Sequence, residues 1–417
     1  MANGNPTDFS SFLEKTQAST NEALKTSDGL YIAEESELEQ MRQQILNKYD
    51  GIDVQHSYLD EAGQVWDCIP IEQQPSLRGS QVGVATPTDL PTSEQEVQEL
   101  ETRGHLIEPH DCPGQTDRLG NEMSCPPGTI PIRRVTLSEM ARFRTLRDFF
   151  QKAPDGGQHP RLSGARARLA ESHKYAHAYQ YVNNVGGQSH VNIWQPAIHT
   201  GATQIFSLSQ HWYAGGSGSS LQTVECGWQV YPGKYGNANA NLFIYWTADG
   251  YNNTGCYNLD RSAFVQTNPK WNLGGHLRPV STTGGTQYQM FFSFYLYQDN
   301  WWLYLQGGAA SDAVGYYPTS LFSGGQLATN ATEIDYGGET VGTTSWPPMG
   351  GGAFANQGWQ KAACQSDIRY YPPGSKNAKE ASLTGSQRSP YCYTIDVSNS
   401  GSWNEHFYFG GPGGSYC

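Results

Sequence analysis

Charged residues are scarce in this sequence of 417 residues, at 16% of the total. No apolar run is long enough to span a membrane, and no basic patch indicates a nucleic-acid partner. The Cys-x-x-Cys spacing of metal sites, the Gly-x-Ser-x-Gly nucleophile elbow and a phosphate-binding loop are also missing. We therefore expect no membrane partner, nucleic-acid partner, cofactor or metal.

Charge of the two signs is unevenly distributed. Residues 1–100 hold 18 acidic and 5 basic residues, whereas the other 317 residues hold 21 of each, so the net charge of -13 belongs to the N-terminal part. Residues 151–417 hold only 14 acidic and 14 basic residues. A domain with few carboxylates gains little positive charge on acidification, and its folded state should therefore tolerate low pH.

Glycine and aromatic residues are abundant, with 47 Gly, 25 Tyr and 11 Trp. After His173, short apolar stretches alternate with glycine-rich turns such as 215–218, 284–285 and 324–325. No run with helical periodicity interrupts this alternation. The pattern predicts an all-β domain built as an antiparallel β-sandwich.

The N-terminal part has a different pattern. One helix is expected to carry Leu38, Met41 and Ile45 on one face, and another to follow the capping-box pattern Thr136-x-x-Glu139. This part is therefore predicted to be a partly helical α+β region.

The boundary between the two parts is expected near residue 160. Residues 151–169 are rich in turn formers and arginine, which is typical of an exposed and cleavable linker. An acidic helical front, a linker and a β-rich back are the pattern of a prosegment with its mature domain. A stable two-domain protein with an ordinary linker fits the same pattern.

The stretch 223–230 alternates as a strand does. Glu225, Gly227 and Gln229 share one face, and apolar side chains share the other. A carboxylate and an amide beside a glycine would suit an extended peptide that lies across a sheet. Because an isolated glutamate is usually just solvated, this interpretation depends on a second glutamate downstream.

The second carboxylate is Glu339, which follows two glycines. If Glu225 and Glu339 face each other across a sandwich groove, they cannot both ionise cheaply, and the pKa of one of them should rise. The ionised glutamate would take a proton from water as it attacks a peptide carbonyl. The protonated glutamate would hydrogen-bond the carbonyl oxygen and later serve the leaving amine, and such a pair works best in acid.

Two histidines, His173 and His177, have the spacing of a zinc-binding helix. Lys174 stands where the general-base glutamate of that motif belongs. We therefore interpret both residues as structural histidines rather than metal ligands.

Short motifs occur through nearly the whole chain. They are Asp67-Cys68, Gln74-Pro75, Cys125–Arg134, Asn192–Pro196, Phe206–Gln210 with Trp212, Glu225–Val230, Leu242–Tyr251, Thr254–Leu259, Gly337–Glu339 and Phe409–Gly413. In this order they resemble the neprosin family of glutamic endopeptidases. The resemblance implies a secreted protein that is made as a zymogen, folds as an antiparallel β-sandwich, uses two glutamates and, in some members, cleaves after proline.

The resemblance places the two catalytic glutamates at Glu225 and Glu339. Gln229 would position the water or the carbonyl. An aromatic subsite for a proline ring would be formed by Trp228, Trp246, Tyr251 and Tyr336. Core packing explains each aromatic residue as well, and the strand pattern puts Trp228 on the face opposite Glu225. Asp249 is interpreted as a turn residue.

The eight cysteines suit an oxidising compartment. The resemblance implies a C-terminal bridge, and departures from the family pattern suggest a second, compensating pair. The candidate pairs are Cys392–Cys417, Cys226–Cys256, and Cys125 with either Cys68 or Cys112. The remaining front cysteine would then pair with Cys364 and join the two parts of the chain.

We therefore expect a secreted zymogen of an acid-acting glutamic endopeptidase whose substrates are proteins and peptides. Residues 1–160 would be a prosegment that covers the groove, and residues 161–417 the β-sandwich catalytic domain. Acid would neutralise the carboxylates of the prosegment, weaken its contacts and allow self-cleavage in 151–169. The alternative is a non-catalytic carbohydrate- or cell-wall-binding sandwich, with Trp301 and Trp302 stacking on sugars.

Overall fold

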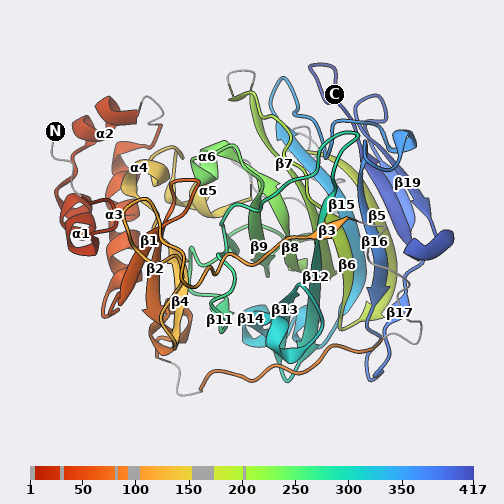
Figure 1. The fold of residues 1–417 in the computed structure, drawn as a ribbon, viewed down its shortest axis with the longest axis horizontal. Helices are drawn as coiled ribbons and strands as arrows, with labels where there is room; N and C mark the ends of the chain where they lie inside the picture. The colour runs from red at the N-terminus through yellow and green to blue at the C-terminus, as the bar shows by residue number, and fades with distance from the viewer. Residues whose placement is uncertain (1–4, 29–31, 80–82, 93–103, 153–172, 201–202) are drawn as a thin grey trace.

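The computed structural model describes residues 5–28, 32–79, 83–92, 104–152, 173–200 and 203–417. Within these residues, two large antiparallel sheets lie face to face, and helices with a small third sheet lie at one end of them (Figure 1). The predicted β-sandwich with a partly helical N-terminal region is thus confirmed.

The first sheet, as far as the chain is described, has the strand order β10-β9-β8-β7-β15-β5-β18. Its strands are β5 His173–Asn184, β7 Gln204–Gly215, β8 Gln222–Val230, β9 Asn241–Thr247, β10 Cys256–Tyr257, β15 Ala331–Gly342 and β18 Thr384–Gln387. The late strand β15 therefore lies between β5 and β7, which begin the domain. This insertion brings residues that are far apart in the sequence onto neighbouring strands.

The second sheet has the order β11-β14-β13-β12-β6-β16-β20-β19, with β17 beside β16 and β3 beside β12. Its strands are β3 His105–Leu106, β6 Gly186–Asn192, β11 Val265–Gln266, β12 Tyr288–Tyr297, β13 Asn300–Leu305, β14 Ala313–Pro318, β16 Ala363–Tyr370, β17 Lys379–Glu380, β19 Thr394–Ser398 and β20 His406–Gly410.

The main core lies between the inner faces of the two sheets. Tyr213 of β7 stacks on Trp301 of β13, and the ring of His211 exchanges a hydrogen bond of 2.7 Å with Ser189 of β6. Trp301 and Trp302 are both fully buried. Neither tryptophan can therefore stack on a sugar, which removes the two aromatic residues named for the carbohydrate-binding alternative.

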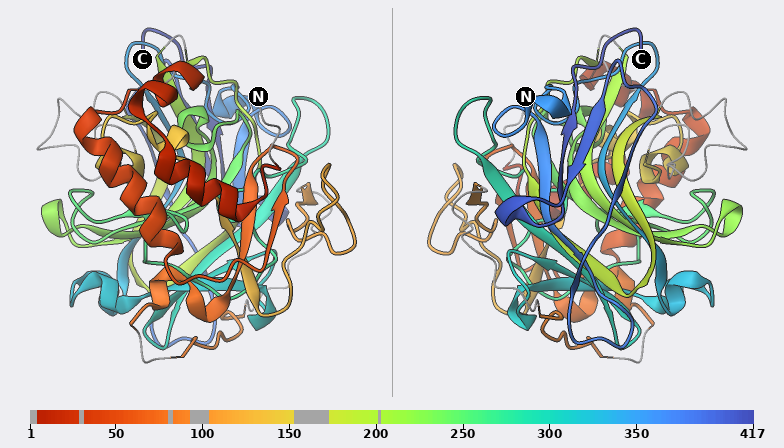
Figure 2. Two further views of the ribbon diagram at one scale, coloured as in Figure 1. Left: turned by 90° about the vertical axis from the view of Figure 1, so that its left-hand side faces the viewer. Right: turned by 90° about the vertical axis from the view of Figure 1, so that its right-hand side faces the viewer.

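The N-terminal region packs as helices against a small sheet of order β1-β2-β4 (Figure 2). Its elements are α1 Phe9–Ala18, α2 Asn21–Asp28, α3 Glu35–Tyr49, β1 His56–Leu59, β2 Val65–Pro70, β4 Thr129–Arg133, α4 Leu137–Met140 and α5 Leu146–Phe150. Helix α3 buries the predicted Leu38, Met41 and Ile45, and the capping box of Thr136 and Glu139 opens α4. Among the described helices, none is long and apolar enough to cross a membrane.

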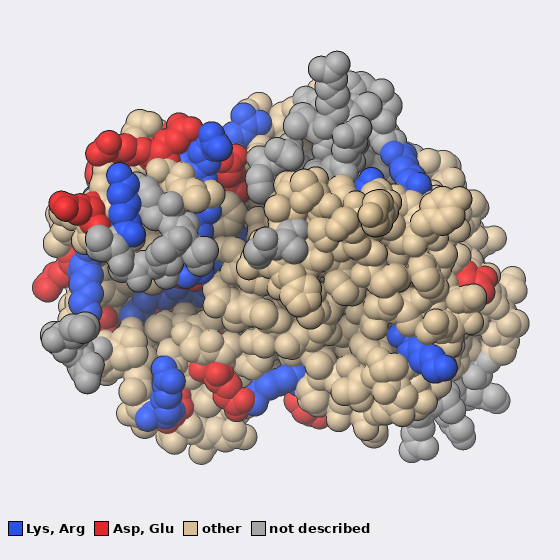
Figure 3. All heavy atoms as spheres, turned by 90° about the horizontal axis from the view of Figure 1, so that it is seen from above, with Lys and Arg blue, Asp and Glu red and all other residues tan. Residues whose placement is uncertain are grey.

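The N-terminal region also reaches along the sandwich. Strand β3 pairs in parallel with β12, and the backbone N–H of Leu90 donates to the carbonyl oxygen of Gly308 at 2.8 Å. Seen from above, charged side chains gather over the N-terminal region, whereas the sandwich shows few of them (Figure 3). The predicted boundary at 160 and most of the predicted linker lie outside the described residues.

Disulfides join Cys68 to Cys125 and Cys392 to Cys417. The first selects Cys68 over Cys112 as the partner of Cys125, and the second is the bridge that the resemblance implied. Both bridges are local, since one ties β2 to the start of the β4 segment and the other ties the C-terminus to the loop before β19.

The other two cysteine pairings are wrong. Cys226 of β8 lies opposite Ile244 of β9, and Cys256 of β10 lies opposite Trp246 of β9, so the whole strand β9 separates the two sulfurs. Cys112 packs beside the Cys68–Cys125 bridge in the N-terminal region, whereas Cys364 lies on β16 of the second sheet. No disulfide therefore joins the two regions among the described residues.

Candidate active site

Glu225 and Glu339 lie on the same face of the first sheet. Glu225 of β8 is opposite Trp212 of β7, and Glu339 of β15 is opposite Leu208 of the same strand. Paired residues of antiparallel strands share a face, and Leu208 and Trp212 are an even number of residues apart. The structure thus brings the two predicted glutamates close together on one sheet. Both carboxylates come from one sheet, on either side of β7, and the core lies behind them.

Lys152 enters between the two carboxylates from the N-terminal region. Its Nζ donates to Glu225 Oε2 at 2.7 Å and to Gln210 Oε1 at 2.9 Å, and it lies 3.0 Å from Glu339 Oε2. The ammonium also lies 5.0 Å from the ring centre of Trp212. The side chains of the lysine and both glutamates are 0% exposed. The two glutamates thus meet at a single nitrogen atom in a site that is closed to bulk solvent.

The segment that carries Lys152 is anchored through two of its backbone carbonyl groups. The hydroxyl of Tyr257 donates to the carbonyl oxygen of Lys152 at 2.9 Å. The Nζ of Lys234, in the short helix α6 Pro232–Tyr235, donates to the carbonyl oxygen of Phe149 at 2.7 Å. Helix α5 is therefore fixed against the sandwich, and the lysine that follows it closes the face that carries the glutamates.

Two hydroxyl groups hold the second oxygen of Glu225. Tyr251 donates to Oε1 at 2.5 Å and Thr223 donates to the same atom at 2.8 Å. Burial, followed by the charge of Glu225 and this hydrogen bond, raises the pKa of Tyr251 well above its ordinary value, so the phenol remains a donor. Tyr251 lies in the turn between β9 and β10, where Asp249 accepts hydrogen bonds from Thr254. Asp249 is thus the predicted turn residue.

A histidine holds the second oxygen of Glu339. The Nδ1 of His173, at the start of β5, lies 2.6 Å from Glu339 Oε1. Burial alone would raise the pKa of Glu339, but the charge of Lys152 and then the hydrogen bond and charge of His173 bring it below its ordinary value. The sequence reasoning treated His173 as structural, because only the pairing of β5 with β15 reveals its carboxylate partner.

His177 has the same kind of partner, since its Nδ1 lies 2.8 Å from Asp335 Oδ1. Residues 173 and 177 are on a strand, so their spacing puts them on one face without forming the helix that a zinc motif requires. Within the described part of the chain, no group of three or more His, Cys, Asp or Glu side chains is arranged to hold a metal ion.

Three of the four aromatic residues predicted for a substrate subsite lie in the core instead: Trp228, Trp246 and Tyr336. Trp228 Nε1 donates to the carbonyl oxygen of Asn192 at 3.0 Å, and Trp246 packs edge-on against Phe322. Tyr336 lies edge-on to His211, with 4.6 Å between ring centres. Their positions along the strands alternate with those of the glutamates, which directs all three side chains to the inner face.

The other two predicted binding residues lie on the face of the glutamates. Tyr251 contacts Glu225 directly. Gln229 is fully buried two side chains further along β8, and its Nε2 donates to the hydroxyl of Tyr257 at 3.1 Å. The amide that contacts the Lys152 ammonium between the glutamates is instead that of Gln210, which belongs to a motif quoted above but received no functional role from the sequence.

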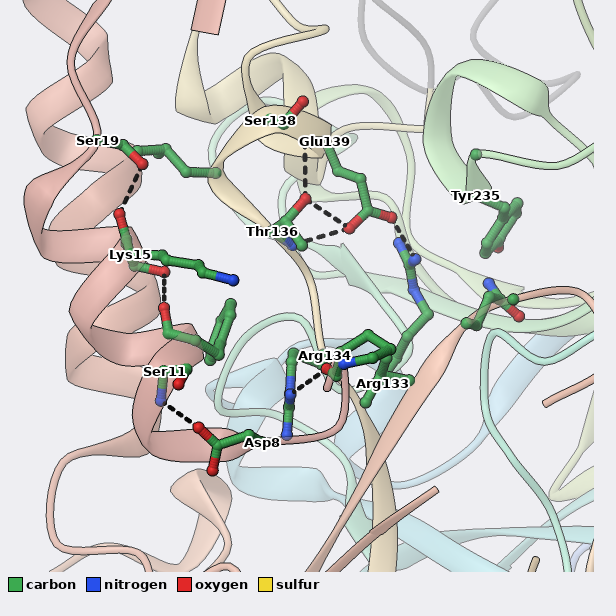
Figure 4. Close-up of a pocket in the computed structure, with 18 of the residues that line it drawn as sticks. Asp8, Ser11, Lys15, Ser19, Arg133, Arg134, Thr136, Ser138, Glu139 and Tyr235 are labelled. Carbon is green, nitrogen blue, oxygen red and sulfur yellow. Dashed lines mark hydrogen bonds and ion pairs between the residues drawn. The ribbon is translucent and has the colours of Figure 1, made fainter. Parts of the chain in front are cut away.

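A separate cavity of about 450 Å³ lies in the N-terminal region, between α1, α4 and β4 (Figure 4). Arg133 Nη1 donates to Glu139 at 2.7 Å, and Arg134 Nη1 donates to the carbonyl oxygen of Pro6 at 2.9 Å. Arg133 Nη2 also donates to the carbonyl oxygen of Lys234 in the short helix before β9, at 3.1 Å. The cavity is therefore a seam between the N-terminal region and that helix, and neither Glu225 nor Glu339 lines it.

In a comparison with protein families, the Neprosin model matches residues 203–412. The chain belongs to the Neprosin family. The protein is accordingly a glutamic peptidase, as the resemblance of the motifs implied. The matched residues include β7, β8 and β15, and therefore Gln210, Glu225 and Glu339.

Solved structures with a distant likeness to the chain include two of scytalido-glutamic peptidase with transition-state analogues. The first shares 10% sequence identity with this chain at a TM-score of 0.32, and the match covers 57% of this chain and 98% of that one. The second shares 11% identity at a TM-score of 0.29, and the match covers 58% of this chain and 98% of that one. SCP-B, a member of the Eqolisin family in complex with the tripeptide Ala-Ile-His, shares 10% identity at a TM-score of 0.28, covering 58% and 98%. At these TM-scores no feature of those sites is transferred to this chain.

Replacing Lys152 by methionine should leave two buried carboxylates without their shared cation. We expect the free energy of unfolding of the full chain to fall by about 3–5 kcal/mol at neutral pH. The loss should shrink in acid, where protonated carboxylates no longer need the cation. Urea denaturation at about pH 7 and about pH 5 measures both values. Lys15→Met, on the exposed face of α1, is the control, and an equal loss at the two pH values would contradict the ion-pair account.

Proposed function

We propose that this protein is the secreted zymogen of an acid-acting glutamic endopeptidase, in which Glu225 and Glu339 activate water for attack on a peptide bond. The observation that carries the proposal is the position of the Lys152 ammonium, which touches one oxygen of each carboxylate. A water molecule is similar in size to an ammonium group. Once the lysine leaves, water at the same point contacts both glutamates.

The pair works with one shared proton. Two carboxylates that flank one water molecule in a dry site cannot both be charged at low cost, so one of them holds a proton. At neutral pH the positive charge of Lys152 removes this requirement. In acid, and without the lysine, the pair is in the state that general acid–base catalysis needs.

Glu339 is the base in this scheme. His173 lies against its Oε1 and favours its ionised form, while Oε2 faces the water. Glu225, whose Oε1 is held by neutral hydroxyls, carries the shared proton on Oε2. The water oxygen bonds to the carbonyl carbon as its proton passes to Glu339. The proton of Glu225 then passes to the leaving nitrogen as the C–N bond breaks.

The N-terminal region acts as the intramolecular inhibitor, because its Lys152 occupies the position of the attacking water. Acid weakens this contact by protonating Glu339, whose pKa is held below its ordinary value chiefly by the charge of Lys152. It also acts on Asp260, whose pKa burial raises but Lys234, and then Lys48 and Arg133 of the N-terminal region, bring below its ordinary value. The buried ion pairs at this boundary, more than the surface carboxylates of residues 1–100, are thus the acid-sensitive contacts.

Substrates of this site are proteins and peptides, and the preference for proline that some relatives show extends the proposal. Tyr251 is the predicted aromatic residue that lies at Glu225, and Tyr245 stacks on it with 6.0 Å between ring centres. Together with Trp212 beside the lysine, these rings supply an apolar surface for a proline ring. Extracellular localisation is supported by the two disulfides.

Replacing either Glu225 or Glu339 by glutamine should abolish cleavage of a quenched, proline-containing peptide library at acidic pH. After acid activation and removal of the N-terminal region, we expect kcat/KM to fall by about 10³-fold or more, because each glutamate transfers a proton. Glu380→Gln, an exposed glutamate of the same domain, should cut as the wild type does, and the cut sites test the proline preference. A processed wild type that cuts none of the peptides would instead favour the carbohydrate-binding alternative, which glycan arrays then test.

Acid should convert the full chain to two fragments. Because the pKa of Glu339 is lowered in the folded zymogen, its contribution to stability is fully present above its ordinary value near 4.5 and is lost as pH falls through the lower folded value. We expect fragments on a gel only below about pH 4.5. The double variant Glu225→Gln, Glu339→Gln should remain intact if the cut is made by the protein itself. A single full-length wild-type band at low pH would refute the mechanism.

Replacing His173 by glutamine should move the acid limb of the kcat/KM profile of the processed enzyme to higher pH. The histidine favours the ionised form of Glu339, so its loss raises the pKa of the base. His177→Gln, which removes the neighbouring histidine from the same strand, should leave that limb in place. An unshifted acid limb in the His173 variant would assign the base to the other glutamate.

A further inference from the structure

Gln210 occupies the centre of the surface between the two glutamates. It lies on β7, which separates β8 from β15, and it is opposite Gly227 on one side and Gly337 on the other. Residues that lie opposite one another on neighbouring strands form a row across the sheet. In the row of Gln210, neither neighbour has a side chain, so the amide lies between the carboxylates of the two adjoining rows. The close approach of strands at both glycines keeps this arrangement fixed, since a Cβ on Gly227 would lie 2.0 Å from the carbonyl oxygen of Ser209.

The amide oxygen of Gln210 has a hydrogen-bond partner, whereas its amide nitrogen has none among the described residues. Oε1 accepts a hydrogen bond from Lys152 at 2.9 Å, whereas Nε2 is fully buried and donates to no described residue. A buried amide donor without an acceptor is a net cost to the folded state, and a carbonyl oxygen of a bound peptide would remove that cost. The missing acceptor lies on the face where a substrate peptide would lie, beside the two glutamates.

We propose that Gln210 is a third catalytic group of this peptidase, whose amide oxygen orients the attacking water and whose amide nitrogen stabilises the oxyanion. The inference rests on the proposed function and deepens it. Water in the place of the Lys152 ammonium donates one hydrogen to Glu339 and the other to Gln210 Oε1, and it accepts from protonated Glu225. Since the oxygen and nitrogen of an amide are attached to one carbon, the same side chain spans the water and the neighbouring carbonyl oxygen of the substrate.

The amide supplies a neutral donor where negative charge develops. As the water oxygen bonds to the carbonyl carbon and its proton passes to Glu339, the electron pair of the C=O bond moves to the oxygen, which Nε2 of Gln210 hydrogen-bonds. When the C=O bond re-forms, the C–N bond breaks and the leaving nitrogen takes the proton of Glu225. The amide itself gains and loses no proton, so its contribution does not depend on pH.

This assignment replaces the role expected of Gln229. That residue shares the face, but it lies in the row of Leu208 and Glu339, and its own donor is bonded to Tyr257. Gln210 is the glutamine whose side chain reaches the point at which the glutamates meet.

The test compares processed wild type with Gln210→Ala and Gln210→Glu on one peptide substrate across the acidic pH range. Loss of an oxyanion donor should lower kcat of the alanine variant by about 10²–10³-fold, with a much smaller change in KM. The glutamate variant keeps the shape and the acceptor but loses the donor when it is ionised. It should be as impaired as the alanine variant at the upper end of the range and recover in part at the lowest pH, where a protonated carboxyl group donates again.

Ser209→Ala is the matched control, because Ser209 is the next residue on β7 and faces Gln365 in the core. It should retain the kcat of the wild type. Thermal unfolding checks that every variant is folded. If Gln210→Ala does not fold, a folded Gln210→Glu enzyme still decides the test.

Three results would overturn the assignment. The first is a folded Gln210→Ala enzyme with kcat within about threefold of the wild type, far from the loss expected for an oxyanion donor. The second is a Gln210→Glu enzyme with wild-type activity at all pH values. The third is faster acid processing with unchanged kcat, which would make Gln210 only a ligand of Lys152. A silent processed wild type would instead refute the proposed function, and the assignment with it.

Discussion

The contact of one buried ammonium with two buried carboxylates is the interaction on which the rest of this structure depends. Each charge alone would be very costly to remove from water, and two carboxylates together would repel each other. Lys152 makes the burial of Glu225 and Glu339 tolerable, and hydrogen bonds from Tyr251, Thr223 and His173 satisfy the outer oxygens. The set is stable only as a whole, so removal of any charged member changes the ionisation of the others.

The surrounding fold can be understood as the support of this contact. Strand β7 sets the separation of the two glutamates, because one lies on β8 and the other on β15. Lys234 and Tyr257 of the sandwich domain hold the carbonyl oxygens of Phe149 in α5 and of Lys152, which keeps the lysine in its position. The same rigid sheet that would hold a catalytic pair in place thus also holds the pair in contact with Lys152.

Sequence reasoning was accurate where the information is local. Alternation along 223–230 predicted the face of Glu225, and turn composition predicted the β-sandwich and the role of Asp249. The capping box at Thr136 formed as expected. Each of these features depends on residues within a few positions of one another, so their spacing records the geometry.

What the sequence could not show depends on the order of strands. Nothing local to 331–342 indicates that β15 lies between β5 and β7, and this insertion brings His173 to Glu339 and places Gln210 between the two glutamates. The error over Cys226 and Cys256 has the same origin, because the strand between them is known only from the pairing. The family resemblance supplied the two glutamates but not the groups that control their protons.

In the zymogen proposed above, strand β3 would give the inhibition a second property. Residues 105–106 pair with β12, and residues 83–92 follow the second sheet, so the N-terminal region is held at places far from Lys152. A single cut between 152 and 173 breaks no such contact. It changes a tethered inhibitor into a bound one, whose release is a dissociation equilibrium between two chains. Dilution would then promote activity, and a concentrated store of cut molecules would remain silent until it is dispersed.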